Sequence, residues 1–170
     1  MKSILPVRLT RLAERVIAEN IAAGRTVTIA ESCTGGLVAA ALTEIPGSSA
    51  VFGSGYVTYS NEAKMKMLGV NEDILDTFGA VSVAVVWAMA QGALKKSGAD
   101  IAVAVSGVAG PDGGTEKKPV GTVVFAVAEK GKDPEEMTAD RKNFGSDKSR
   151  YEIRMYAALY ALELLLPSTP

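Results

Sequence analysis

The sequence predicts an α/β fold: a three-layer α/β/α sandwich with a mixed, mostly parallel sheet. First, short apolar segments of strand length alternate with longer segments whose apolar residues recur at helical spacing. Second, residues 101–105 are apolar throughout, as in a strand that helices cover on both faces. Third, 170 residues with 48% hydrophobic content suffice for one well-buried core, so we expect a single domain over residues 1–170.

The first half of the chain alternates between helix and strand patterns. Leu9, Leu12 and Val16 recur at helical spacing, and Gly24 follows where a C-terminal cap belongs, which predicts a helix over residues 9–23. The next expected elements are, in order, a strand at 27–30, an alanine-rich helix at 36–45 and a strand at 51–59. Two short helices follow. Asn61 is expected to cap the first, which ends before Gly69, and Asn71 the second, which ends at Phe78.

The second half begins with a longer helix and then becomes rich in strands. Ser82 is placed to cap a helix over residues 83–96, and Gly98 marks its end. The remaining expected elements are a strand at 101–105, a loop with four glycines at 106–114, strands at 120–128 and 137–144 joined by a turn at 131–134, and a closing helix at 151–166. The predicted order is therefore α-β-α-β-α-α-α-β-β-β-α.

The charge balance and the cysteine content exclude several classes of protein. With 18 Lys and Arg against 19 Asp and Glu, the chain has no general basic field, so we expect no nucleic-acid partner. No apolar run approaches the roughly 20 residues that span a bilayer, and the N-terminus lacks a signal-like pattern, so we expect no membrane partner. A single cysteine cannot form an internal disulfide. These features predict a soluble, cytoplasmic protein.

The chain contains no histidine, which restricts its chemistry. A Ser-His-Asp triad, a Cys-His pair and a histidine metal site are all excluded. Since no histidine can activate it, Cys33 is expected to be a small buried residue. A serine nucleophile would need another base, and lysine is the leading substitute.

Residues 27–36 contain the strongest candidate for a reactive site. A β-branched apolar run ends in a polar cluster and two glycines, which is how a strand delivers hydroxyls and backbone N–H groups to the start of a helix. Ser32 is then a candidate nucleophile, and the N–H groups near Thr34, Gly35 and Gly36 are a candidate cradle for an anion or oxyanion. Alternatively, Ser32 is only a helix N-cap, the commoner role for a serine at this position. The length of the polar cluster argues against this, because a cap needs one side chain.

Two further segments could complete such a site. Lys64 lies five residues beyond Tyr59, in the predicted short helix. A lysine acts as a base only where burial or a nearby cation lowers its pKa, whereas a lone helical lysine is usually exposed, and Tyr59 could equally be an ordinary strand residue. The loop at 106–114 could expose N–H groups to a phosphate or carboxylate, or be only a wide turn. If the preceding strands are parallel, these segments meet at the carboxyl edge of the sheet.

A basic stretch precedes and enters the last predicted helix. Arg150 and Arg154 lie on one face of that helix because they are four residues apart. Such a stretch is usually a solvated face, but an arginine at a helix start can also bind a phosphate with two parallel hydrogen bonds.

Together, these segments resemble the nicotinamide-nucleotide amidohydrolases, also called the CinA C-terminal domain. The likeness covers nearly the whole chain, in order. The stretches that carry it are residues 30–36, 47–49, 55–64, 79–82, 106–114 and 119–123. Near the last helix the chain departs from the family's Gly-Asp-Arg pattern, and Arg150 keeps its register only if two residues are inserted. Family members also occur fused to an N-terminal nucleotide-processing domain, which this chain lacks, so we expect no pyrophosphatase activity.

The resemblance implies hydrolysis of the carboxamide of nicotinamide mononucleotide to nicotinic acid mononucleotide and ammonia, in pyridine nucleotide salvage. It implies Ser32, Lys64 and Tyr59 as the catalytic residues, with Ser32 as the nucleophile, Lys64 as its proton acceptor and Tyr59 nearby. No metal or other cofactor is expected. The residues expected to bind the nucleotide substrate are Thr34, Gly35, Gly36, Asn61, Ser106, Gly107, Gly110 and Arg150.

Two other functions stay open at this point. The chain could be a non-catalytic nucleotide-binding or regulatory module of the competence and damage-inducible type, or an amidohydrolase of another small amide. A homodimer or larger assembly is also expected, because the alanine-rich helices and the leucines of the last helix could pack between copies. Those leucines are Leu159, Leu162, Leu164, Leu165 and Leu166.

Overall fold

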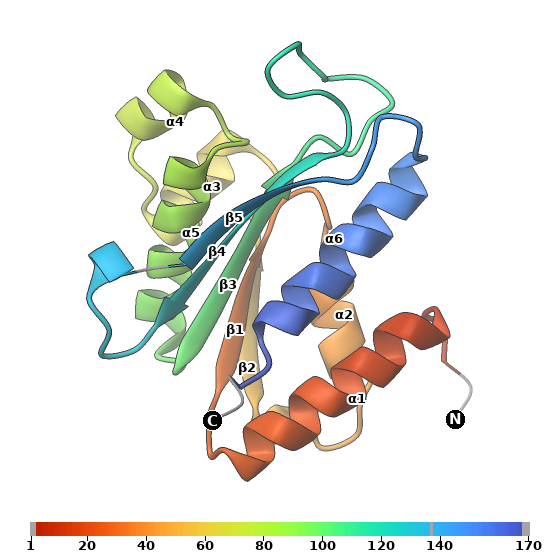
Figure 1. Cartoon of the computed structure of the whole chain (residues 1–170). Coiled ribbons are helices and arrows are strands. Elements are labelled where there is room, and N and C mark those ends of the chain that lie inside the picture. Colours follow the sequence, from red (N-terminus) through yellow and green to blue (C-terminus); the bar gives the residue numbers. More distant parts are fainter. Residues whose placement is uncertain (1–2, 137, 168–170) are drawn as a thin grey trace.

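The computed structural model describes residues 3–136 and 138–167, which form one five-stranded sheet between two layers of helices (Figure 1). The strands, in the order in which they lie side by side, are β2 (Phe52–Val57), β1 (Val27–Glu31), β3 (Ile101–Gly107), β4 (Thr122–Glu129) and β5 (Thr138–Asn143). β1 is parallel to β2 and β3, whereas β4 is antiparallel to both of its neighbours. Four of these five strands therefore run in one direction, and the predicted mixed sheet is confirmed. Met137, the expected start of the last strand, lies outside the described residues.

The helices divide between the two faces of the sheet, which gives the predicted three layers (Figure 1). One layer consists of α1 (Val7–Ala22), α2 (Leu37–Thr43) and α6 (Arg150–Leu164). The other consists of α3 (Asn61–Leu68), α4 (Glu72–Phe78) and α5 (Val83–Ser97). Two short 3₁₀ segments, Ser48–Ala50 and Pro134–Glu136, were not expected.

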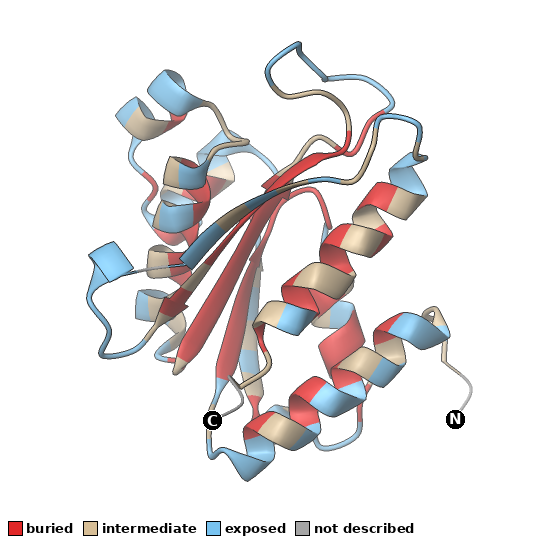
Figure 2. Ribbon diagram, viewed as in Figure 1, coloured by how far each residue is buried: buried red, intermediate tan, exposed pale blue. Residues whose placement is uncertain are grey.

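The core lies on both faces of β3, as its unbroken apolar sequence predicts (Figure 2). Val103 and Val105 pack into the cluster that includes α1, α2 and α6, whereas Ala102 and Ala104 pack into the cluster under α5. This division follows from the strand pleat, which directs successive side chains to opposite faces. The small alanines let α5 lie close to the sheet.

The caps of the middle helices agree with the sequence except at one position. Asn71 and Ser82 accept hydrogen bonds from helical N–H groups, as predicted. For α3 the expected Asn61 cap is wrong, because Ser60 accepts the hydrogen bond from the Ala63 N–H at 3.0 Å and Asn61 is the first helical residue. The hydroxyl of Ser60 lies one residue earlier, at the extended position that a cap requires.

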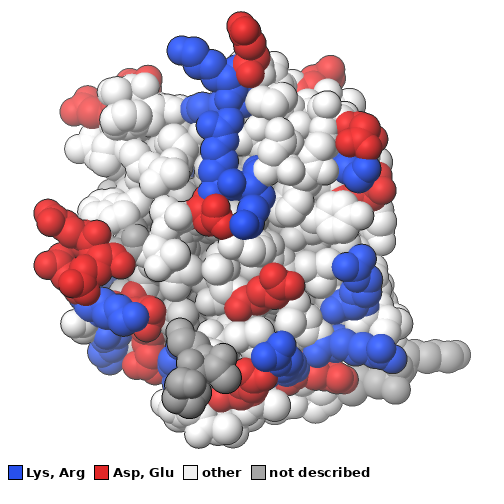
Figure 3. Space-filling view, viewed as in Figure 1, with Lys and Arg blue, Asp and Glu red and all other residues white. Residues whose placement is uncertain are grey.

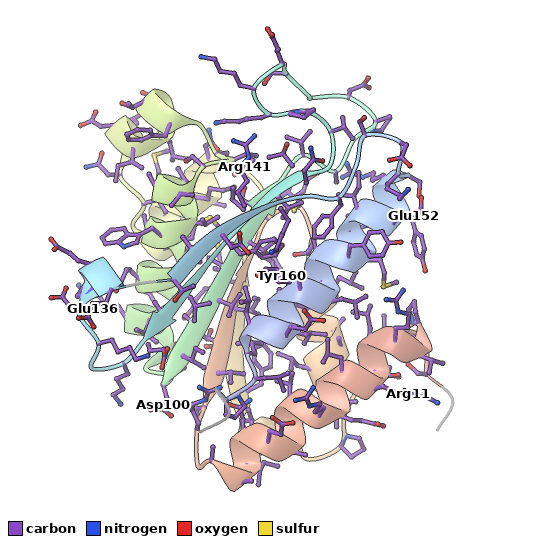
Figure 4. All side chains as sticks on the ribbon, in the orientation of Figure 1. Arg11, Asp100, Glu136, Arg141, Glu152 and Tyr160 are labelled. Atoms are coloured by element: carbon purple, nitrogen blue, oxygen red, sulfur yellow. The ribbon has the colours of Figure 1, made fainter. Side chains whose placement is uncertain are left out.

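The last helix begins one residue earlier than predicted, at Arg150. Ser149 and Glu152 form a reciprocal capping box, in which each side chain accepts from the other's backbone N–H. Glu152 is labelled in Figure 4 at this end of α6. The box fixes where α6 starts and therefore where Arg150 lies.

The leucines on which the expected assembly rested are used within the chain. Leu162 and Leu165 are fully buried, and Leu159, Leu164 and Leu166 pack against the same core. They therefore provide no separate argument for a homodimer, which stays a prediction. None of the helices in the described part of the chain combines the length and apolar character needed to cross a bilayer.

Two close contacts fix how neighbouring segments pack around the sheet. α3 lies against α5 at Gly92, where a Cβ atom would collide with the Leu68 carbonyl. The long loop between β3 and β4 is tied to β5, because Arg141 donates to the Lys117 carbonyl at 2.6 Å. Arg141 is labelled in Figure 4, and Figure 3 shows a column of basic side chains on this upper part of the face.

Candidate active site

The three predicted site segments meet at the carboxyl ends of β1, β2 and β3, at the top of the sheet in Figure 1. The Ser32 N–H donates to the Val105 carbonyl at 3.0 Å, and the Thr58 N–H donates to the Glu31 carbonyl at 2.8 Å. The strand pairing therefore continues just past the strand ends. It brings Ser32 beside the residues that follow β2 and β3, as the parallel arrangement predicted.

Lys64 reaches Ser32 from α3. Its amine lies 3.1 Å from the Ser32 hydroxyl and donates a hydrogen bond to the Thr58 carbonyl at 2.8 Å. A separation of 3.1 Å is within the range for direct proton transfer. The hydroxyl and the amine come from segments 32 residues apart, so only the fold brings them together.

The environment of the Lys64 amine favours its neutral form. The residue is 1% exposed, and no carboxylate of the described residues lies within ion-pair distance of it. Burial disfavours the charged form of an amine. Desolvation accordingly lowers the pKa of Lys64 from its ordinary value of 10.5, with a smaller opposing effect from Cys33. A lysine in this position can accept a proton from a neighbouring hydroxyl.

Glu31, rather than Ser32, satisfies the start of α2. Its fully buried carboxylate accepts hydrogen bonds from the N–H groups of Gly36, Val38 and Ala39 at 3.0, 3.2 and 2.8 Å. The alternative in which Ser32 is only a helix cap therefore fails. Because Glu31 caps the helix, the Ser32 hydroxyl stays free to face Lys64.

The backbone donors beside Ser32 differ from the expected cradle. The Gly35 N–H donates to the Ser32 carbonyl at 3.0 Å, and the Gly36 N–H donates to Glu31. Within the described residues, the N–H groups of Cys33 and Thr34 have no acceptor. The donors left without an acceptor in this turn are thus those of Cys33 and Thr34, one residue earlier than expected. These two residues are 5% and 0% exposed.

Tyr59 and Arg150 lie together at the edge of the site. Arg150 donates to the Tyr59 hydroxyl at 3.0 Å and to the Gly110 carbonyl at 2.7 Å. Tyr59 is 62% exposed, and only its backbone carbonyl, at 3.5 Å, contacts the Lys64 amine. The phenol of Tyr59 therefore faces Arg150 rather than Ser32 and Lys64.

The remaining predicted binding residues lie around these groups. The buried Ser106 hydroxyl donates to the Ala80 carbonyl at 2.8 Å, so it ties the end of β3 to the segment before α5. Gly107 has no room for a side chain, because a Cβ atom would meet the Thr122 carbonyl at 2.8 Å. Gly110 has φ +76°, which favours glycine. Asn61 is exposed at the start of α3.

A surface hollow of about 500 Å³ lies beside Arg150. Its other lining residues come from the glycine loop, from the segment before β4 and from the start of α6: Pro111, Gly114, Thr115, Glu116, Pro119, Val120, Ser146, Lys148 and Ser149. The hollow is therefore open to a ligand that also contacts the predicted phosphate-binding arginine.

Sequence reasoning missed two residues of this site. Glu31 was noted only as part of a polar cluster, and Arg154 only as a neighbour of Arg150 on a helix face. Arg154 donates to the carbonyls of Cys33 and Thr34, at 3.2 and 2.9 Å. The sequence signals were the polar residue directly before Ser32 and the four-residue spacing from Arg150. Neither signal identifies the backbone groups that these side chains bind.

Comparison with known proteins identifies the family. The CinA C-terminal domain matches residues 9–169, so the chain belongs to the CinA C-terminal domain family. Among solved structures, competence/damage-inducible protein CihA from Agrobacterium tumefaciens superposes with a TM-score of 0.90 at 47% identity, over 96% of this chain and 97% of that one. A CinA-superfamily protein from Klebsiella pneumoniae gives a TM-score of 0.85 at 39% identity, over 92% and 94% of the two chains.

Curated relatives carry two kinds of name. A protein of Enterobacter agglomerans, 52% identical over 94% of each chain, is named nicotinamide-nucleotide amidohydrolase PncC. The PncC of Escherichia coli K12 is 53% identical over 92% of each chain. A putative competence-damage inducible protein of Symbiobacterium thermophilum is 60% identical over 73% of this chain, but the match spans only 28% of that protein's length.

Proposed function

We propose that this protein hydrolyses the carboxamide of nicotinamide mononucleotide, giving nicotinic acid mononucleotide and ammonia. The observation that carries the proposal is the buried Lys64 amine, 3.1 Å from the Ser32 hydroxyl. Relatives that match over almost their whole length are named for this activity. A nucleophile with a lysine base suits a chain without histidine.

The first half of the reaction forms an acyl-enzyme. The Ser32 oxygen attacks the carboxamide carbon while its proton passes to the neutral Lys64 amine. The resulting oxyanion accepts hydrogen bonds from the N–H groups of Cys33 and Thr34, which have no acceptor within the described residues. The Lys64 ammonium then gives its proton to the departing nitrogen, so the C–N bond breaks and ammonia leaves.

The second half releases the acid. Water attacks the Ser32 ester and gives a proton to the Lys64 amine, and the C–O bond to Ser32 then breaks. Lys64 returns the proton to the Ser32 oxygen, which restores the starting state. One water is consumed and one ammonia is released for each amide. The protein's contribution is to hold the hydroxyl, the amine and the two backbone donors in fixed positions.

The nucleotide part of the substrate would occupy the hollow beside Arg150. The guanidinium lies between the Tyr59 hydroxyl and the Gly110 carbonyl, and both are weaker partners for it than a phosphate would be. In this proposal Arg150 binds the phosphate, and the loop with Ser106, Gly107 and Gly110 contacts the ribose. Tyr59 acts by positioning Arg150, and Asn61 borders the same opening.

The test is ammonia release from nicotinamide mononucleotide by the purified protein. We expect Ser32→Ala to lower kcat by at least about a thousandfold and Lys64→Met by about 10²–10⁴-fold. Lys66→Met is the matched control, because Lys66 lies on the same helix and forms only an exposed pair with Glu62. Turnover that survives Ser32→Ala would contradict the mechanism.

The same assay separates the two alternative functions. A nucleotide-binding module would bind nicotinamide mononucleotide, as measured by calorimetry, without releasing ammonia. An amidohydrolase of another small amide would prefer a different member of a panel that includes nicotinamide and its riboside. Preference for the mononucleotide over both is the outcome that we expect.

A further inference from the structure

The Ser32 turn is held from outside by one side chain of α6. Arg154 donates through Nε to the Cys33 carbonyl at 3.2 Å and through Nη2 to the Thr34 carbonyl at 2.9 Å. Arg154 is half-buried and forms no ion pair within the described residues. Its charge is therefore directed at two backbone carbonyls that lie one and two residues beyond the nucleophile.

These contacts fix the direction of a backbone donor. In a trans peptide the N–H points opposite to the C=O of the same unit. Because Arg154 holds the Cys33 carbonyl, the Thr34 N–H of that peptide points away from the guanidinium. The Gly35 N–H in turn holds the Ser32 carbonyl at 3.0 Å, which directs the Cys33 N–H out of the turn in the same manner.

The guanidinium also strengthens the donor that it orients. A cation bound to a carbonyl oxygen polarises the peptide, and hydrogen bonds linked through one polarised group reinforce each other. The Thr34 N–H belongs to the peptide whose carbonyl Arg154 binds. Glu31 binds the N–H groups further along the turn and the helix, so it does not compete for this donor.

We propose that Arg154 is a positioning residue for catalysis: it orients and polarises the Thr34 N–H, which binds the oxyanion formed when Ser32 attacks. This inference rests on the proposed amidohydrolase function. Arg154 and Arg150 are thereby given different tasks, although they lie on one face of α6. Arg150 faces the nucleotide, and Arg154 faces the back of the turn that carries the nucleophile.

Different tasks predict different kinetic effects. We expect Arg154→Ala to lower kcat for nicotinamide mononucleotide by about 10- to 100-fold while KM changes by less than about twofold, because an oxyanion donor acts in the transition state. Added guanidinium at low millimolar concentration should restore part of the lost kcat. Arg154→Lys keeps the charge but cannot hold two carbonyls with one planar group, so it should give an intermediate kcat. If the alanine variant does not fold, the lysine variant provides the same test.

Arg15→Ala is the matched control. Arg15 lies on α1 in an exposed pair with Glu19, so its loss should leave kcat unchanged and guanidinium should have no effect on that variant. Wild-type protein that releases no ammonia would contradict the proposed function. Active wild-type protein, with kcat unchanged in both Arg154 variants or with the loss confined to KM, would overturn the role of Arg154 alone.

Discussion

The Lys64 amine lies 3.1 Å from the Ser32 hydroxyl and is almost completely shielded from solvent. Because it is buried and no carboxylate of the described residues lies within ion-pair distance, this amine has a lower pKa than an exposed lysine. The proposed nucleophile and base are thus within hydrogen-bond distance, and the pKa of the amine is lowered. Several measurable properties follow from this pair and from the groups that surround it.

The activity should depend on pH through Lys64. Desolvation lowers the pKa of this amine below 10.5, and the base must be unprotonated, so kcat/KM should rise with pH through that lowered pKa. The measurement is the pH profile of ammonia release, and Lys66→Met should give the same profile as the wild type. A rising limb with an apparent pKa at or above 10.5 would contradict the assignment.

Stability should change with pH for the same reason. Because the pKa of Lys64 is lower in the folded than in the unfolded state, the unfolded state binds the proton more readily between the two values. The free energy of unfolding should therefore rise as the pH increases from the lowered pKa to about 10.5. The cost of burying the Lys64 amine, which lowers the stability of the folded state, is fully present below this pH window and absent above it.

Urea denaturation of the wild type and of Lys64→Met at several pH values measures this effect. We expect the variant to lack the rise, so that the stability of the wild type increases relative to that of the variant as the pH approaches 10.5. A constant difference over that range would show that Lys64 has the same pKa in both states.

Glu31→Gln should reduce both stability and activity. An amide offers one acceptor oxygen where the carboxylate accepts three N–H groups, and its own NH₂ faces donors. We expect a loss of about 1–3 kcal/mol in the free energy of unfolding, measured by denaturation, and a lower kcat. Glu62→Gln, which alters only an exposed pair with Lys66, should leave both unchanged.

Cys33 should be unreactive although it lies next to Ser32, the proposed nucleophile. Burial raises the pKa of its thiol to about 12, so almost no thiolate exists near neutral pH. Iodoacetamide should modify the thiol slowly in the folded protein and quickly in urea, and Cys33→Ala should keep most of the wild-type kcat. Rapid labelling of the folded protein with loss of activity would instead make Cys33 a candidate nucleophile.

Arg150→Ala should weaken the recognition of phosphate. We expect KM for nicotinamide mononucleotide to rise about tenfold or more, with a smaller change for the riboside, which has no phosphate. Arg11→Ala, an exposed change on α1 labelled in Figure 4, is the control. Equal effects on both substrates would assign Arg150 to holding Tyr59 and the glycine loop instead.

Much of the fold could be predicted because its signals are local. The Asn71 and Ser82 caps and the positive φ of Gly24 act within a few residues of their position in the sequence. The strand order and the reversed direction of β4 could not be predicted, since they depend on pairing between distant segments. The choice of Ser60 over Asn61 as a cap was missed because both residue types favour that role.

The candidate site could also be predicted only where its signals are local in the sequence. Ser32 was a candidate because it lies in a polar cluster between a strand and two glycines, and the histidine-free composition made lysine the leading base. That this lysine is Lys64 was implied by the family resemblance, since a lone helical lysine is usually exposed. Glu31 and Arg154 act on backbone N–H and C=O groups, which every residue has, so residue types could not identify their partners. For Arg154 these partners lie 121 and 120 residues away in the sequence.

The position of Lys64 relative to Ser32 depends on Gly92, a residue of α5. α3 ends at Leu68, one helical turn after Lys64, and its final carbonyl occupies the space that any side chain on position 92 would need. We expect a single methyl group there to push the helix outward and to move the Lys64 amine away from the Ser32 hydroxyl. The 3.1 Å spacing of these two groups therefore depends on a position of α5 that carries no side chain.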